Sequence, residues 1–279
     1  MVEIVMESNM DRLQRDEWYS IALNAALDAG RAIMKIYAQP FDVNYKQDNS
    51  PLTIADQNAD DIISKHLALT NVPVLSEEGP AHSYDIRQNW NLCWIVDPLD
   101  GTKEFIKKNG EFTVNIALVE NGVSIFGLIY APALGVLYYG EKGKGAFKLL
   151  VPDLNIEKLD ATSAIALPLQ QLPNIFSIIG SHSHASAETN LYVDSLKTIH
   201  GEVDYMRSGS SLKFCLLAEG KAHIYPRFAP TMEWDTAAGQ AILEAAGGTL
   251  VEWHSKKQML YNRKDLLNSW FLAEAKKSD

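Results

Sequence analysis

The pattern of residues 113–149 constrains the fold most, because it predicts consecutive antiparallel strands. Two apolar runs, TVNIALVE and VSIFGLIYA, flank Asn121-Gly122, a pair that favours the type I′ turn of a β-hairpin. The next segment, LGVLYYGEKGKGAFKLL, indicates a second hairpin around its glycines. A sheet of this kind must be covered by other elements of the chain.

Helical periodicity precedes this sheet. Residues 16–38 place apolar side chains at helical spacing, and a second helix is expected at about 53–69. Residues 72–75 and 92–96 are short apolar runs typical of strands. Two helices followed by an antiparallel sheet predict a layered α+β lobe, to which we assign residues 1–155.

Strand and helix patterns alternate beyond a connection at residues 150–174. Apolar runs at 175–181 and 222–225 are typical of strands. The helices expected in this part of the chain are 185–198, 210–219 and 235–246. Such alternation predicts an α/β second lobe, residues 156–279.

Charge and cysteine content exclude several classes of protein. With 35 acidic and 25 basic residues, the chain has a net charge of −10 and lacks the excess of basic residues that DNA or other nucleic-acid binding needs. Cys93 and Cys215 lie in apolar runs without metal-site spacing, so we expect buried thiols in a reducing compartment. We expect no signal peptide and no membrane span, hence a cytoplasmic protein; peripheral contact with the inner face of the cell membrane stays open.

Acidic residues recur where an apolar strand or a turn ends. Glu77-Glu78 follows VPVLS, the DPLD segment at 97–100 follows WIV, and Asp235 precedes an alanine-rich run. Each has a plain structural explanation, respectively a solvated loop pair, an Asx-type turn and a helix N-cap. Together the acids suit a hard divalent cation such as Mg²⁺, with structural Ca²⁺ as the alternative.

The two aspartates of DPLD can converge on one ion. Asp97 and Asp100 would lie together if Pro98 turned the chain at the strand end. The carbonyl of Leu99 would add an oxygen ligand. The following pair, Gly101-Thr102, offers backbone N–H groups to phosphate oxygens at a helix start.

Three further residues could bind an anion. Ser210, in an SGSS run, opens a predicted helix, Lys213 lies one turn into it, and Arg227 could hold a second phosphate with its guanidinium fork. The plain alternative for Lys213 and Arg227 is a solvated surface side chain. His182 and His184 could touch a ribose or phosphate, or belong to a surface loop.

In this order and spacing, EE, DPLDGT and WDTAAG resemble the magnesium-dependent, lithium-sensitive inositol monophosphatase superfamily. DNSPLTIAD, GSSLKFCLLAEG and YPRF narrow the resemblance to its 3′(2′),5′-bisphosphate nucleotidases. The likeness extends over roughly residues 16–273. It implies a layered αβαβα sandwich of the inositol monophosphatase/fructose-1,6-bisphosphatase type, with the active site between two lobes.

The resemblance also implies residue roles. Two or three Mg²⁺ ions would be bound, one by Glu77, Asp97 and the Leu99 carbonyl. Another would be bound by Asp97, Asp100 and Asp235. The expected catalytic residues, which act on the attacking water, are Asp56, Glu77 and Thr102. The expected substrate-binding residues are Glu77, Leu99, Asp100, Gly101, Thr102, Ser210, Lys213, Arg227 and Asp235.

The activity implied is hydrolysis of the 3′-phosphate of adenosine 3′,5′-bisphosphate to give AMP, extending to 3′-phosphoadenosine 5′-phosphosulfate, in sulfate assimilation. An inositol monophosphatase or another sugar-phosphate phosphatase is the alternative within this class. A non-catalytic metal or phosphate sensor is a weaker one, because the acidic set is intact. The expected partner is a small nucleotide, with no nucleic acid; monomer and homodimer both stay open.

Overall fold

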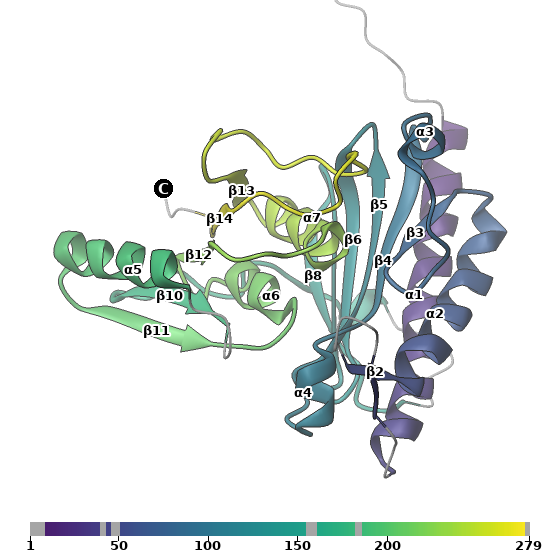
Figure 1. Ribbon diagram of the computed structural model, residues 1–279, viewed down its shortest axis with the longest axis horizontal. Coiled ribbons are helices and arrows are strands. Elements are labelled where there is room, and N and C mark those ends of the chain that lie inside the picture. Colours follow the sequence, from purple (N-terminus) through teal and green to yellow (C-terminus); the bar gives the residue numbers. More distant parts are fainter. Residues whose placement is uncertain (1–8, 40–42, 46–50, 155–160, 182–185, 277–279) are drawn as a thin grey trace, which may run out of the picture.

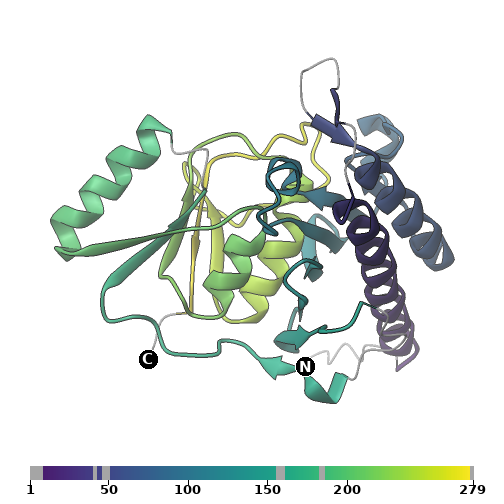
Figure 2. The same cartoon turned by 90° about the horizontal axis from the view of Figure 1, so that it is seen from below.

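Helices and sheets alternate through the molecule in layers (Figures 1 and 2). The structure, a computed structural model, describes residues 9–39, 43–45, 51–154, 161–181 and 186–276. No helix in these ranges is long and apolar enough to cross a membrane. Both cysteines, Cys93 and Cys215, are buried free thiols, as predicted.

Five helices make up the three helical layers. α1 (Asn9–Tyr37) and α2 (Ile54–Leu67) pack on one face of a seven-stranded sheet. α6 (Leu212–Ala218) and α7 (Ala237–Ala245) lie between this sheet and a five-stranded one. α5 (Ala187–His200) covers the far face of the five-stranded sheet. The expected αβαβα sandwich is confirmed.

The seven-stranded sheet has the order β3-β4-β5-β6-β7-β8-β9. Its strands are β3 (Val74–Ser76), β4 (Leu92–Asp100), β5 (Thr113–Glu120), β6 (Val123–Ala131), β7 (Val136–Glu141), β8 (Gly145–Leu150) and β9 (Ile165–Ala166). β3 and β4 are parallel and the other pairs are antiparallel. Both predicted hairpins are present, with Asn121 and Gly122 at the positive φ of 50° and 80° that their turn requires. β9 lies beyond residue 155, so the chain past the expected lobe boundary still adds a strand here.

The five-stranded sheet is mixed, with the order β11-β10-β12-β14-β13. Its strands are β10 (Phe176–Gly180), β11 (Val203–Arg207), β12 (Ile224–Arg227), β13 (Thr249–Glu252) and β14 (Phe271–Glu274). β10 is parallel to β11 and β12, whereas β14 is antiparallel to β12 and β13. The predicted alternation missed β11, β13 and β14. Edge strand β11 has no buried residue, so its sequence carries no apolar run.

Shorter elements complete the described chain. They are the β1–β2 hairpin (Val43–Tyr45 and Pro51–Thr53), α3 (Tyr84–Arg87), α4 (Thr102–Ile106) and the 3₁₀ turns Ala68–Thr70, Ala161–Ser163 and Glu233–Asp235.

α7 lies directly on the sheet because two strands carry glycine beneath it. A Cβ added to Gly127 of β6 would lie 2.2 Å from the carbonyl oxygen of Ala238. One added to Gly140 of β7 would lie 2.8 Å from the Cα of Ile242. This close approach brings the turn before α7, which ends at Asp235, against β4.

We expect Gly127→Ala to lower the free energy of unfolding by about 3 kcal/mol, because the clash is with backbone that cannot rotate away. Urea unfolding measures the change. Gly143→Ala is the control, since its added Cβ meets no atom within 4 Å and only the positive φ of 82° opposes it. That backbone strain should cost about 1 kcal/mol. An equal loss in the two variants would show that α7 does not depend on the contact.

Candidate active site

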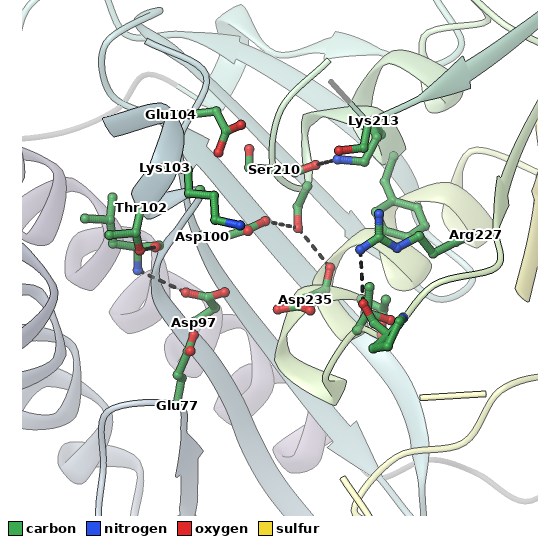
Figure 3. A pocket seen from close by; sticks show the side chains of 18 of the residues that line it. Glu77, Asp97, Asp100, Thr102, Lys103, Glu104, Ser210, Lys213, Arg227 and Asp235 are labelled. Atoms are coloured by element: carbon green, nitrogen blue, oxygen red, sulfur yellow. Dashed lines mark hydrogen bonds between the residues drawn. The ribbon is translucent and has the colours of Figure 1, made fainter. Parts of the chain in front are cut away.

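A cavity of about 630 Å³ lies between the two sheets, where α2, α4, α6 and the turn before α7 come together (Figure 3). Every residue that the sequence singled out as catalytic, metal-binding or substrate-binding lines it. These are Asp56, Glu77, Asp97, Leu99, Asp100, Gly101, Thr102, Ser210, Lys213, Arg227 and Asp235. His182 and His184 lie outside the described residues.

A one-residue bulge in β4 brings Asp97 and Asp100 to the same side of the sheet. Asp97 pairs with Asn115 of β5, and Asp100 pairs with Thr113, so three steps along β4 match two along β5. The chain does not reverse at Pro98, because the strand continues through it to Asp100, but the Leu99 N–H donates to Asp97 Oδ1 at 3.1 Å, which is the hydrogen bond of the Asx-type alternative. The bulge also turns the Leu99 side chain into the core beneath α1 and α2.

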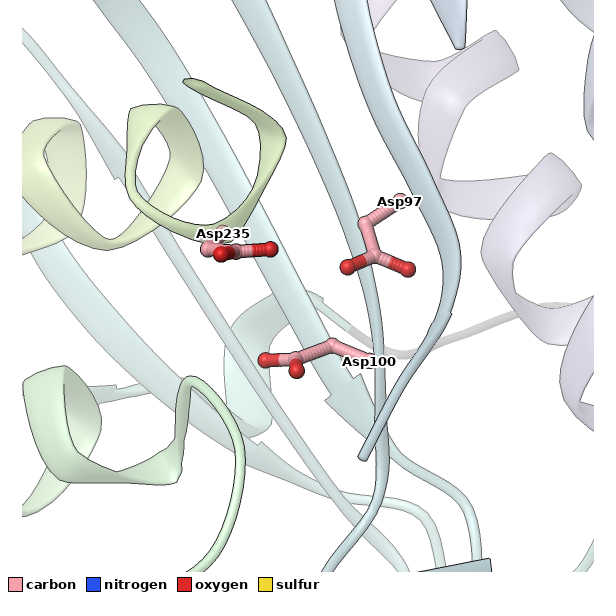
Figure 4. A group of neighbouring side chains, drawn as sticks. All are labelled: Asp97, Asp100 and Asp235. Atoms are coloured by element: carbon pink, nitrogen blue, oxygen red, sulfur yellow. The ribbon is translucent and has the colours of Figure 1, made fainter. Parts of the chain in front are cut away.

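Asp235 reaches the same place from the 3₁₀ turn before α7 (Figure 4). One carboxylate oxygen from each of Asp97, Asp100 and Asp235 lies within 4.8 Å of the others. Asp235 ends a 3₁₀ turn, and its Oδ2 accepts a hydrogen bond of 2.8 Å from the Met232 N–H. The expected N-cap role is wrong, because Thr236 precedes α7 and the Asp235 carboxylate binds the turn before it.

Two more acids border this cluster. Glu77 follows β3, and its N–H donates to the Val96 carbonyl at 3.2 Å. Because β3 and β4 are parallel, their carboxyl ends lie at one edge of the sheet and bring Glu77 near Asp97 (Figure 3). Asp56 is buried in the first turn of α2.

The cavity has cationic side chains opposite these acids. Figure 3 shows Lys213 and Arg227 across the cavity from Glu77 and Asp97. Lys213 is only 6% exposed and its Nζ donates to the Ser210 carbonyl, so the alternative of a solvated lysine is wrong. Burial lowers the pKa of Lys213 to about 8. Arg227 Nη2 donates to the Pro230 carbonyl at 3.0 Å, while its Nε is buried without a hydrogen-bond partner among the described residues.

The sequence profile of the inositol monophosphatase family matches residues 14–278. This chain belongs to the inositol monophosphatase family. The 3′(2′),5′-bisphosphate nucleotidase CysQ of Escherichia coli K12 is 46% identical over 250 residues, which cover 88% of this chain and 95% of that protein. The crystal structure of CysQ from Bacteroides thetaiotaomicron has a TM-score of 0.85 at 48% identity, covering 93% of this chain and 97% of that one. An inositol monophosphatase from Zymomonas mobilis shares the fold, with a TM-score of 0.71 at 21% identity over 94% of this chain and 93% of its own.

The acidic cluster of this family member fits a divalent cation electrostatically. Burial raises the pKa of the Asp97 carboxyl well above its usual range, and four neighbouring carboxylates, of which Glu77 acts most strongly, raise it further. Burial also raises the pKa of the Asp235 carboxyl to about 8, with Asp100 as the next cause. Buried carboxylates this close repel one another unless a proton or a cation lies between them. Hard oxygen donors of this kind suit Mg²⁺.

The predicted site residues did not include Lys103, Glu104, Asn115 or Ser211, although Ser211 belongs to the SGSS run that was expected to open a helix at an anion. Lys103 and Glu104 line the cavity from α4. Ser211 and Asn115 lie behind Asp100 and bind its carboxylate. The sequence signal for Asn115 is a polar side chain in the middle of an apolar strand.

We expect the metal-free protein to become more stable as the pH falls from about 8 to about 6. The folded-state pKa of Asp235, about 8, lies above its usual 3.8, so the protonated carboxyl contributes stability that is lost as the pH rises through the folded pKa. Thermal melts in EDTA measure this slope. Saturating Mg²⁺ and, separately, Asp97→Asn should flatten it, because each removes part of the repulsion. If the melting temperature of the metal-free protein stays constant or falls as the pH is lowered from about 8 to about 6, repulsion among these carboxylates does not set its stability.

Proposed function

We propose that this chain is a magnesium-dependent phosphatase that removes the 3′-phosphate of adenosine 3′,5′-bisphosphate, giving AMP and phosphate. The observation that carries the proposal is the pairing, in one cavity, of a carboxylate cluster with the cations Lys213 and Arg227. The carboxylates would hold the metal ions that bind the reacting phosphate. The side chains of Lys213 and Arg227 would bind a second phosphate. The relatives named as bisphosphate nucleotidases support the same substrate class.

The metal ligands in this proposal come from both lobes. Glu77, Asp97 and the Leu99 carbonyl would hold one Mg²⁺. A second would share Asp97 and take Asp100 and Asp235, all of which line the cavity. Bound Mg²⁺ would neutralise phosphate charge and lower the pKa of the attacking water.

The remaining residues would act on the water and the transferred phosphate. Asp56 and Glu77 border the acidic cluster, where a carboxylate can accept a proton from water. Thr102 Oγ1 lies 3.5 Å from the Leu99 carbonyl, at the start of α4. Gly101 precedes it with φ at 90°, and a Cβ there would lie 3.2 Å from Ser210 Cβ. The absence of a side chain thus leaves the backbone open to a phosphate oxygen.

The second phosphate would bind the cationic wall. Ser210, Lys213 and Arg227 line it, and a guanidinium fork binds phosphate oxygens with two hydrogen bonds. Binding energy from this remote phosphate would favour a bisphosphate over a monophosphate. The same proposal includes turnover of 3′-phosphoadenosine 5′-phosphosulfate and a role in sulfate assimilation. It also includes lithium sensitivity, a cytoplasmic location and the division into lobes 1–155 and 156–279.

We expect phosphate release to require a divalent cation and to be fastest with adenosine 3′,5′-bisphosphate. A phosphate-release assay compares this substrate with its 2′,5′ isomer, 3′-phosphoadenosine 5′-phosphosulfate, inositol 1-phosphate and fructose 1,6-bisphosphate, each with Mg²⁺ and with EDTA. Full activity in EDTA would refute the metal mechanism. A preference for inositol 1-phosphate would instead identify an inositol monophosphatase.

Arg227→Ala and Lys213→Ala should each lower kcat/KM for the bisphosphate roughly tenfold to a hundredfold, because a charge-assisted phosphate contact contributes about 1.5–3 kcal/mol. Hydrolysis of inositol 1-phosphate should change little. Arg207→Ala, which removes an exposed arginine of β11 outside the cavity, is the matched control. An equal fall in kcat/KM for both substrates would mean that Lys213 and Arg227 do not bind the second phosphate.

A further inference from the structure

Ser211 connects the acidic residues of the two lobes. Its Oγ lies 2.7 Å from Oδ2 of Asp100, at the end of β4, and 2.9 Å from the carbonyl oxygen of Asp235. The residue is 2% exposed and stands immediately before α6. A single hydroxyl therefore touches one side chain and one backbone group of the acidic cluster.

Two residues of β5 orient this hydroxyl. Thr113 Oγ1 donates to Asn115 Oδ1 at 2.9 Å, which turns the amide nitrogen of Asn115 toward Ser211. That nitrogen donates to Ser211 Oγ at 2.9 Å and lies 3.4 Å from Asp100 Oδ2. Thr113 and Asn115 are 0% and 1% exposed, so the chain of donors is shielded from water.

The hydroxyl proton of Ser211 has two acceptors within reach, and the carboxylate is the stronger one. Hydrogen bonds to an ionised acceptor are shorter and stronger than those to a neutral carbonyl, in line with the 2.7 Å and 2.9 Å distances. Since Asn115 donates to the same oxygen of Ser211, the hydroxyl must donate elsewhere. Both donors thus converge on Oδ2 of Asp100 and leave Oδ1 for another partner.

We propose that Ser211 and Asn115 are positioning residues that hold Oδ2 of Asp100, so that Oδ1 is presented to a divalent cation shared with Asp97 and Asp235. This inference rests on the proposed function, because it takes Asp100 as a metal ligand. Donors that orient a metal-binding carboxylate raise metal affinity, and their loss typically costs tenfold to a hundredfold. Because Ser211 and Asp100 belong to different lobes, the same bond ties the cation site to the packing of α6 on the sheet.

Mn²⁺ titration of the metal-free protein, followed by electron paramagnetic resonance, tests the proposal without any substrate. Ser211→Ala should weaken Mn²⁺ binding roughly tenfold to a hundredfold, and Asn115→Ala should weaken it roughly threefold to tenfold. Ser124→Ala is the matched control, because Ser124 is a buried serine whose Oγ donates to the Ala237 carbonyl at 2.8 Å, another bond between the sheet and α7. Its affinity for Mn²⁺ should stay within twofold of the wild type.

Two results would overturn the proposal. One is a folded Ser211→Ala protein that binds Mn²⁺ within twofold of the wild type. The other is an equal loss in Ser124→Ala, which would mean that general packing, not the donor to Asp100, sets the affinity. If Ser211→Ala does not fold, the Mn²⁺ affinity of Asn115→Ala is compared with those of the wild type and Ser124→Ala instead. An Asn115→Ala protein that binds Mn²⁺ as tightly as the wild type would overturn the proposal.

Phosphate release by the wild type separates this inference from the proposed function. A wild-type protein that binds Mn²⁺ but releases no phosphate from any substrate would refute the proposed function. The role of Ser211 would then be decided by the Mn²⁺ affinities of the variants alone. A wild-type protein that hydrolyses the bisphosphate while Ser211→Ala keeps full Mn²⁺ affinity would refute only the positioning role.

Discussion

One additional residue in β4 directs the side chains of Asp97 and Asp100 to the same face of the sheet. Residues three apart in a regular strand face opposite sides of the sheet, so Asp97 and Asp100 would be separated by it. The bulge places both on the side of α6 and α7, while the side chain of Leu99 packs beneath α1 and α2. The acidic cavity depends on this irregularity as much as on the acids themselves.

Close packing of α7 on the seven-stranded sheet completes the cluster. Gly127 and Gly140 allow α7 to lie directly on the sheet, which brings Asp235 against the end of β4. Ser211 then spans from Asp100 to the backbone of Asp235. Carboxylates that repel one another are thereby held together by apolar packing and by the donors Ser211 and Asn115. A divalent cation would relieve this repulsion.

The sequence predicted the layers and the members of the site better than their local geometry. Helical spacing and Asn121-Gly122 indicated the first helical layer and the hairpin of the seven-stranded sheet, and the residues that the motifs predicted for the site all line the cavity. The pattern could not reveal the bulge, because Pro98 suggests a turn as readily as an irregular strand. It also missed β11, whose half-exposed residues lack an apolar run, and the burial of Lys213, which depends on packing from distant elements.

Anomalous diffraction from a crystal soaked in Mn²⁺ tests most directly whether the bulge creates a cation site. We predict an anomalous peak within about 2.0–2.4 Å of carboxylate oxygens from Asp97, Asp100 and Asp235, as expected for oxygen ligands of a divalent ion. A peak bound by only one of these three residues, or no peak in the cavity at saturating Mn²⁺, would contradict it.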